Sequence, residues 1–212
     1  MKALIIGATG ATGKDLVNQL LADADYTTVV IFVRRSTGIV HPKLVEMITD
    51  FNKLEDMSAS ITGDVWFSCL GTTLKAAGSK EKQWQIDYEI PAKFAEIASR
   101  NGVRKMILLS AYGAAADSKV FYSSIKGKLE DKIDSVGFAQ YVIFRPGLLL
   151  RKDTDRAGER IFAGLLNFLN AIGIIRKFKP MPTNTLAQKM AKAPKVLENG
   201  KHIIELNKIF SF

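Results

Sequence analysis

The sequence contains very little cysteine and histidine, and each shortage excludes a class of protein. Cys69 is the only cysteine among 212 residues, so no disulfide can form within the chain. The two histidines, His41 and His202, are isolated, and with one cysteine they make no cluster at a spacing typical of zinc sites. We therefore expect neither a disulfide-stabilised secreted domain nor a metal site.

Long apolar runs are also missing. No stretch of 18 uninterrupted apolar residues occurs, which argues against a membrane-spanning helix. The apolar run nearest the N-terminus, Ala3–Ile6, is four residues long and is followed by glycine, whereas an export signal needs a longer apolar region and a cleavage site. Together with the single cysteine, these features predict a cytoplasmic protein.

The composition suits one globular domain with a basic C-terminal part. Of the 212 residues, 47% are hydrophobic, which is enough for one substantial core. The net charge is +9, and residues 151–212 hold twelve Lys or Arg against five Asp or Glu. Such a region can meet nucleic acid, an anionic membrane surface or a phosphorylated ligand. Because its lysines are spread out, we expect a solvated surface and no specific nucleic-acid partner.

Strand and helix signals alternate over the first 150 residues. Apolar runs predict strands at Lys2–Ile6, Thr27–Val33, Val45–Ile48, Val65–Cys69, Lys105–Leu109 and Tyr141–Phe144. Apolar residues at helical spacing predict helices at Thr12–Ala22, Glu81–Arg100 and Tyr122–Val136. Alternation of this kind indicates βαβ units, and hence an α/β protein with a doubly wound parallel sheet flanked by helices.

The pattern changes after residue 150. The apolar segment Ile161–Ile175 predicts a helix, a second helix is expected around Thr185–Leu197, and His202–Leu206 is expected to be a short strand. We interpret this region as a small addition to one domain that spans residues 1–212. The apolar segment Ile161–Phe178 is expected to pack as core beneath a substrate pocket, and a seat on a membrane or on a second subunit is the alternative.

The sequence GATGATGK at residues 7–14 follows the first expected strand and is typical of a phosphate-binding loop. A loop for a nucleoside triphosphate would need glycine at position 8 and serine or threonine at position 15, where the chain has Ala8 and Asp15. Glycine at every third position (Gly7, Gly10, Gly13) between a strand and a helix instead favours the pyrophosphate of a dinucleotide. The loop residues expected to bind it are Gly7, Thr9, Gly10, Ala11, Thr12 and Gly13.

Two arginines at the end of the second expected strand indicate which dinucleotide binds. Arg34 and Arg35 lie 21 and 22 residues after Gly13. At about this position an acidic residue would accept hydrogen bonds from the ribose 2′-hydroxyl of NAD, whereas guanidinium groups suit the 2′-phosphate of NADP. We therefore predict NADP(H) as the cofactor, and surface arginines without a role are the alternative.

Tyr122 and Lys126, in the sequence YSSIK, are four residues apart at the start of an expected helix and so share one face. Ser110 ends the preceding expected strand, and ligands bind at the carboxyl ends of strands in such sheets. An ammonium beside a phenol favours the phenolate, so this tyrosine can exchange a proton near neutral pH. We predict Tyr122 as proton donor, Lys126 as its partner and a ligand of the nicotinamide ribose, and Ser110 as the group that holds a substrate carbonyl. Polar helix residues without a role are the alternative.

These motifs carry a family resemblance over nearly the whole chain. GATGATG, LLSAYGA with YSSIK, and FRPG at Phe144–Gly147 resemble the atypical short-chain dehydrogenase/reductase superfamily. With FVRRS, CLGTT, QIDYE and YSSIKGKLE, the chain is similar to the Tat-interacting-protein-like group of NAD(P)-binding proteins. The resemblance implies a Rossmann fold, a cofactor-binding core in residues 1–150 and a small C-terminal cap on the substrate side in residues 151–212.

The same resemblance implies further positions around the cofactor. Asp50 and Phe51 would flank the adenine, and Pro146 would help to close the far side of the nicotinamide. Asp87 lies near the place where relatives carry another polar group of the active site, but the resemblance does not assign it a role. The residues implied beside the nicotinamide are Cys69, Leu70, Gly71, Thr72 and Thr73, with Cys69 as a wall residue and not a catalytic thiol.

Two functions follow from these expectations. The first is an NADP(H)-dependent oxidoreductase that reduces a small carbonyl or related substrate by hydride transfer, with Tyr122 as proton donor. The second is a protein that binds NADP(H), senses the redox state of the cofactor and passes it to a partner without turnover, since fold and cofactor do not by themselves establish activity. The sequence names neither the substrate nor the oligomeric state, and it leaves a homodimer open.

Overall fold

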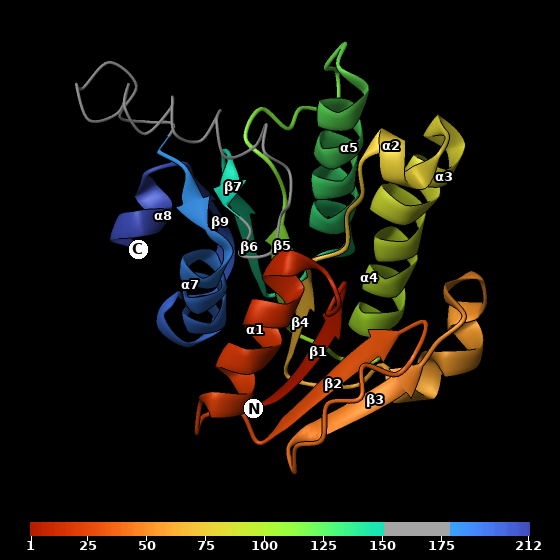
Figure 1. The fold of residues 1–212 in the computed structure, drawn as a ribbon, viewed down its shortest axis with the longest axis vertical. Coiled ribbons are helices and arrows are strands. Elements are labelled where there is room, and N and C mark those ends of the chain that lie inside the picture. The colour runs from red at the N-terminus through yellow and green to blue at the C-terminus, as the bar shows by residue number, and fades with distance from the viewer. Residues whose placement is uncertain (151–178) are drawn as a thin grey trace.

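The computed structural model of the chain describes residues 1–150 and 179–212 (Figure 1). The helix expected at Ile161–Ile175, and the alternative of a membrane or subunit seat for Ile161–Phe178, lie outside the described residues. No helix in residues 1–150 or 179–212 has the length and apolar character needed to cross a membrane.

Seven parallel strands form the central sheet, in the order β3-β2-β1-β4-β5-β6-β9. The chain places β1, β2 and β3 outward in one direction and then returns to β4 on the other side of β1, which confirms the doubly wound parallel sheet. The inner strands are unbroken apolar runs because helices cover both faces of the sheet. The strands are β1 (Lys2–Ile6), β2 (Thr28–Val33), β3 (Leu44–Ile48), β4 (Val65–Ser68), β5 (Lys105–Leu109), β6 (Gln140–Arg145) and β9 (Gly200–Glu205).

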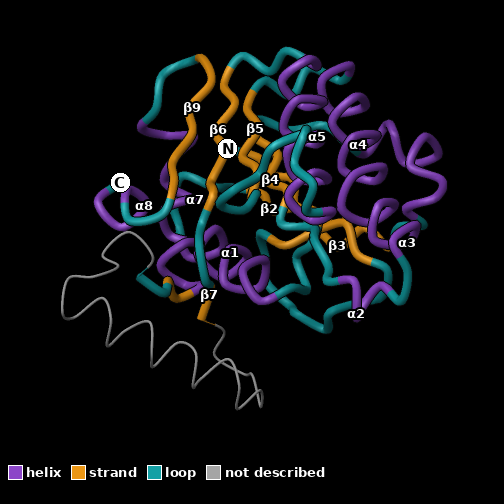
Figure 2. Tube along the Cα trace, turned by 90° about the horizontal axis from the view of Figure 1, so that it is seen from above, coloured by secondary structure: helices purple, strands orange, loops and turns teal. Residues whose placement is uncertain are grey.

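Helices lie on both faces of this sheet (Figure 2), and a separate hydrophobic core lies on each face. On one face the apolar sides of α1 (Ala11–Ala22), α7 (Thr183–Val196) and α8 (Lys208–Ser211) pack against residues such as Ile5 and Ile31. The helices of the other face are α4 (Ile90–Arg100), α5 (Phe121–Val136) and the 3₁₀ segment η1 (Phe51–Ser60).

The helix expected over Glu81–Arg100 is divided in the structure. It consists of α3 (Lys80–Trp84), a turn of π-helix, η2 (Gln85–Glu89), and α4. Pro91 in the first turn of α4 has no N–H to donate to the carbonyl of Asp87, four residues earlier, so the regular α-helical ladder cannot continue there. A short helix, α2 (Leu74–Ala77), precedes α3 and was not expected from the sequence.

The described C-terminal residues belong to the same layers as the N-terminal half. Strand β9 pairs with β6, and α7 packs against α1. The Tyr26 hydroxyl donates to the Ala191 carbonyl at 2.8 Å, and Lys195 forms ion pairs with Asp23 and Asp25. The described part of the expected C-terminal cap therefore completes the sheet and one helical layer. Two further strands, β7 (Leu149–Leu150) and β8 (Met181–Pro182), pair with each other.

Candidate functional site

A cleft of about 610 Å³ opens where the strand order reverses, at the carboxyl ends of β1, β4 and β5. This is the place where doubly wound sheets bind their ligands. It brings together eleven of the residues singled out from the sequence: Gly10, Ala11, Thr12, Cys69, Leu70, Gly71, Thr72, Thr73, Ser110, Tyr122 and Lys126. Eight others do not line it: Gly7, Thr9, Gly13, Arg34, Arg35, Asp50, Phe51 and Pro146.

Two of the three loop glycines are needed for packing. Gly7 has φ = +79°, and a Cβ atom there would lie 2.4 Å from the backbone carbon of Cys69. A Cβ at Gly13 would lie 2.1 Å from the Gly7 carbonyl oxygen. Gly10 is different, because the nearest atom to its Cβ would be 3.4 Å away and the residue lines the cleft. Gly7 and Gly13 therefore let strand, loop and helix pack closely. Gly10, which lacks a side chain, leaves space for a ligand to reach the N-terminus of α1.

The N-terminus of α1 is suited to an anionic ligand. The first N–H groups of a helix have no intrahelical acceptor, and here the N-cap Gly10 supplies no side chain to accept from them. No acidic residue lies in the first turn of α1. Asp15 is turned to α7, where Thr183 Oγ1 donates to it at 2.6 Å, and Lys14 is exposed. The loop thus fits the pyrophosphate of a dinucleotide.

We predict that alanine at position 13 and alanine at position 10 have different effects. Gly13→Ala should lower the midpoint of urea unfolding sharply, because its Cβ meets backbone that cannot move aside. Gly10→Ala should leave that midpoint close to wild type and weaken NADPH binding, measured by titration calorimetry. Equal destabilisation by the two variants would contradict the division of roles.

Lys126 is buried beneath Tyr122 and lies near the Leu70 carbonyl, which follows β4, and near the Asp87 carboxyl of η2. Its Nζ lies 5.9 Å from the centre of the Tyr122 ring, 3.5 Å from the Leu70 carbonyl and 3.9 Å from Asp87 Oδ2. Tyr122 itself is 41% exposed and lines the cleft. The pair expected from the spacing therefore exists as a buried ammonium beside an accessible phenol.

Asp87 is the residue near the cleft to which the sequence assigned no role. It is fully buried, and its Oδ1 accepts a 2.7 Å hydrogen bond from the Thr72 N–H. Its Oδ2 accepts no hydrogen bond from any residue the structure describes. Burial raises the pKa of Asp87, and the nearby Lys126 opposes that rise. The π turn η2 places this carboxyl behind Lys126, and π turns are frequent at functional sites.

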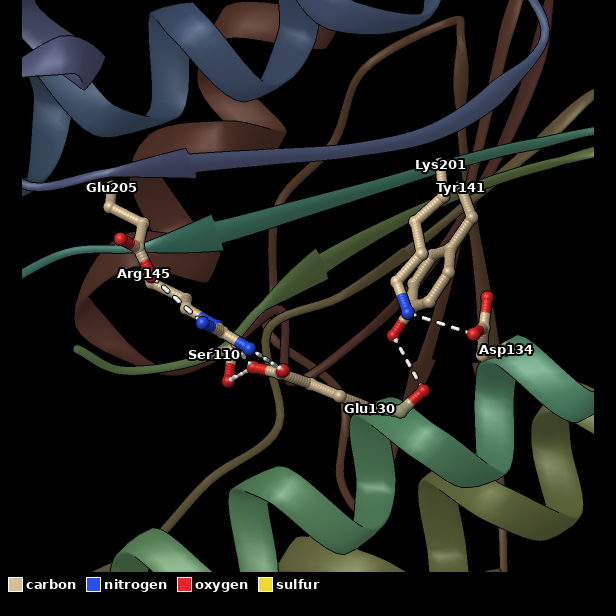
Figure 3. A network of polar contacts seen from close by, with 7 residues as sticks. All are labelled: Ser110, Glu130, Asp134, Tyr141, Arg145, Lys201 and Glu205. Atoms are coloured by element: carbon tan, nitrogen blue, oxygen red, sulfur yellow. Dashed lines mark hydrogen bonds and ion pairs between the residues drawn. The ribbon is translucent and has the colours of Figure 1, made fainter. Parts of the chain in front are cut away.

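A buried polar network holds Ser110 (Figure 3). The Ser110 hydroxyl donates to Glu130 Oε1, which also accepts from Arg145 Nε at 3.0 Å. Arg145 Nη2 donates to the other Glu130 oxygen, and Arg145 Nη1 donates to Glu205 on β9 at 2.8 Å. Glu130 was not predicted from the sequence, although it lies four residues after Lys126 and eight after Tyr122, a helical spacing that places it on the same face.

This network determines how Ser110 meets a ligand. A serine hydroxyl has one proton to donate, and here that proton goes to the Glu130 carboxylate. Ser110 lines the cleft, is 4% exposed, and can accept a hydrogen bond there. To hold a carbonyl oxygen, as the sequence predicted, it must first turn its O–H away from Glu130.

Cys69 lines the cleft, whereas Asp50 and Pro146 lie outside it. Burial raises the pKa of the Cys69 thiol to about 12, so it stays protonated at neutral pH and is a poor nucleophile. Asp50 caps η1 by accepting from the Asn52 N–H at 3.0 Å, and the Pro146 carbonyl accepts from the Tyr112 N–H. Within residues 1–150 and 179–212, no three His, Cys, Asp or Glu side chains are grouped so that they could hold a metal ion.

The chain matches a known protein family. Residues 7–165 match the family described as NAD(P)H-binding, which is most of the chain. FMP52 of Candida albicans is 32% identical over 89% of this chain and 85% of that protein, and HTATIP2 of Rattus norvegicus is 34% identical over 73% and 66%.

Solved structures show the same fold at lower identity. MoeE5 with UDP-glucuronic acid and NAD superimposes with a TM-score of 0.74 at 15% identity, covering 97% of this chain and 76% of that one. UDP-glucose 4-epimerase of Thermotoga maritima gives 0.72 at 13% identity, with 100% and 81% covered. These matches confirm the Rossmann-like fold.

The relatives also correct one expectation. A cytoplasmic protein was predicted from the sequence, but the FMP52 relatives are named mitochondrial, and the prediction is wrong on that comparison. A single cysteine and a short first apolar run do not distinguish the cytoplasm from the interior of an organelle. By its family match and its relatives, the chain belongs to the NAD(P)H-binding family, among the atypical short-chain dehydrogenases/reductases.

Proposed function

We propose that the protein is an NADP(H)-dependent oxidoreductase that reduces a small carbonyl or related substrate, with Tyr122 as proton donor. The observation that carries this proposal is the accessible Tyr122 phenol above the buried Lys126 ammonium, in the same cleft as the N-terminus of α1. A dinucleotide whose pyrophosphate lies at α1 has its nicotinamide half available to this pair.

Arg34 and Arg35 support the phosphorylated cofactor. Both are exposed directly after β2, and neither forms an ion pair with a residue in the described part of the chain. Guanidinium groups in this position suit a 2′-phosphate, which they can bind with two parallel hydrogen bonds each.

The chain's own residues would then handle one proton. When bound, NADPH supplies the hydride that reduces the carbonyl carbon and leaves as NADP⁺. Tyr122 gives its O–H proton to the carbonyl oxygen, so the product is the alcohol. The Lys126 ammonium stabilises the phenolate that remains, and its position depends on the Leu70 carbonyl and Asp87. Lys126 also has donors to offer the nicotinamide ribose.

The first experiment measures NADPH oxidation at 340 nm over a panel of aldehydes, ketones and quinones. The proposal expects a saturable rate with at least one class of carbonyl, and formation of the corresponding alcohol in equal amount. Saturable NADPH binding with no rate on the whole panel would remove the reductase and leave the binding protein.

A second expected result concerns the arginines. The double variant Arg34→Ala/Arg35→Ala should raise the Kd for NADPH by about tenfold or more, since each lost charge-assisted hydrogen bond is worth about 1.5–3 kcal/mol, and should leave the Kd for NADH close to wild type. Lys53→Ala/Lys93→Ala removes the same charge on the opposite helical layer and is the control. Equal weakening of NADPH and NADH would show that the arginines do not read the 2′-phosphate.

The geometry at Ser110 favours a second candidate function, an NADP(H)-binding protein that senses the redox state of the cofactor without turnover. The Ser110 hydroxyl donates its proton to Glu130, so the cleft offers a substrate carbonyl one hydrogen-bond donor fewer than a reductase uses. Calorimetry with NADP⁺ and NADPH, run beside the carbonyl panel, separates the two functions. The sensor predicts a clear difference between the two Kd values and no alcohol product.

A further inference from the structure

The segment after β2 directs three hydrogen-bond donors at one carboxylate of the protein itself. Ser36 Oγ donates to Glu46 Oε2 at 2.6 Å, and the Thr37 N–H donates to Oε1 at 3.0 Å. The Thr37 hydroxyl also donates to Oε1. Each of these donors would equally suit a phosphate, because a phosphate oxygen and a carboxylate oxygen are both pure acceptors.

This cluster lies on the cofactor side of the sheet. Glu46 is on β3 and pairs with Ile31 of β2, whose side chain belongs to the core beneath α1. Side chains in register on parallel strands point to the same face, so Glu46 points to the face of α1. In doubly wound sheets the residues that follow β2 meet the ribose 2′-position of a dinucleotide.

The charges at this position conflict with a 2′-phosphate. Arg34 and Arg35 would attract it, and neither forms an ion pair with a residue among 1–150 and 179–212. Glu46 would repel it, and would also hold the three donors that the phosphate needs. The bonds from Ser36 and Thr37 hold the pKa of Glu46 below its usual range, so the carboxylate remains ionised at neutral pH.

We propose that Glu46 is a competitor built into the 2′-phosphate site, and that it sets how strongly the protein prefers NADP(H) over NAD(H). The 2′-phosphate of NADP(H) takes the Ser36 and Thr37 donors only when the Glu46 carboxylate leaves them. NAD(H) has a hydroxyl at this position and does not require that exchange. This inference rests on the proposed NADP(H) site and adds the residue that limits its affinity.

Isothermal titration of the full chain tests the inference with two matched ligand pairs. NADPH and NADH differ only in the 2′-phosphate, as do adenosine 2′,5′-bisphosphate and 5′-AMP. Glu46→Gln keeps the size of the side chain and removes its charge, and Glu46→Ala removes the contact. Glu96→Gln is the control: it removes an equal charge from a residue of α4, on the opposite face of the sheet, whose side chain is 42% exposed.

We expect Glu46→Gln and Glu46→Ala each to lower the Kd for NADPH and for adenosine 2′,5′-bisphosphate about tenfold. The Kd values for NADH and 5′-AMP should stay within about twofold of wild type. Glu96→Gln should change none of the four. Unchanged or weaker NADPH binding by both Glu46 variants overturns the inference, and weaker binding would mean that Glu46 orders the loop for the phosphate. Wild-type protein that binds neither NADPH nor NADH overturns the proposed function itself, a result distinct from the other two.

Discussion

Tyr122→Phe is expected to lower kcat for carbonyl reduction by at least about a hundredfold, which is the lower end of what a positioned general acid contributes. The change removes one oxygen from a residue that is 41% exposed and makes no contribution to the two cores, so the fold should be unaffected. The Kd for NADPH should stay within about twofold of wild type, because the ring remains over Lys126. Stopped-assay product analysis and calorimetry on the same preparation measure both quantities.

Tyr112→Phe is the matched control for that prediction. Tyr112 is 46% exposed, follows Ser110 by two residues and does not line the cleft. It should retain the wild-type rate. A Tyr122→Phe enzyme that keeps its rate within a few-fold of wild type would mean that the substrate oxygen receives its proton from another group, and the proposed mechanism would be wrong.

Glu130→Ala is expected to reduce the free energy of unfolding by about 3–5 kcal/mol, the usual cost of removing one partner from a buried ion pair. The Glu130 side chain is 4% exposed and accepts from Ser110 and from two nitrogens of Arg145. Arginine is not deprotonated in proteins, so the Arg145 guanidinium stays charged, and loses its buried partner, when Glu130 is removed. Urea unfolding followed by circular dichroism measures the change.

Glu205→Ala provides the comparison, because it removes the other carboxylate bound to the same arginine. Glu205 is 37% exposed, and water can replace it, so a loss of about 1 kcal/mol or less is expected. Equal losses for the two variants would show that the network is not anchored at Glu130. Such a result would also remove the reason to treat the Ser110 proton as held.

The helices and strands were mostly predictable because their signals are local. The inner strands are apolar runs covered on both faces, and Tyr122–Val136 and Lys105–Leu109 lie within a residue of where periodicity predicted them. The helix over Glu81–Arg100 was predicted as one piece because apolar spacing does not report a π turn. That turn depends on Pro91 and on the packing of Asp87 behind Lys126.

What the sequence determined by itself is the class of ligand and the layout of the sheet. These signals are local in the sequence: glycine spacing, strand–helix alternation and the four-residue step from Tyr122 to Lys126. The regular geometry of helices and strands is enough to place residues so close together in the chain. Tertiary structure decided which donors face which acceptors. Ser110 and Glu130 are 20 residues apart, Thr37 in the segment after β2 meets Glu46 on β3, and Arg145 reaches Glu205 across 60 residues. Each of these contacts exists only after the sheet has formed, because hydrogen bonds between distant side chains depend on the packing that brings the two groups together.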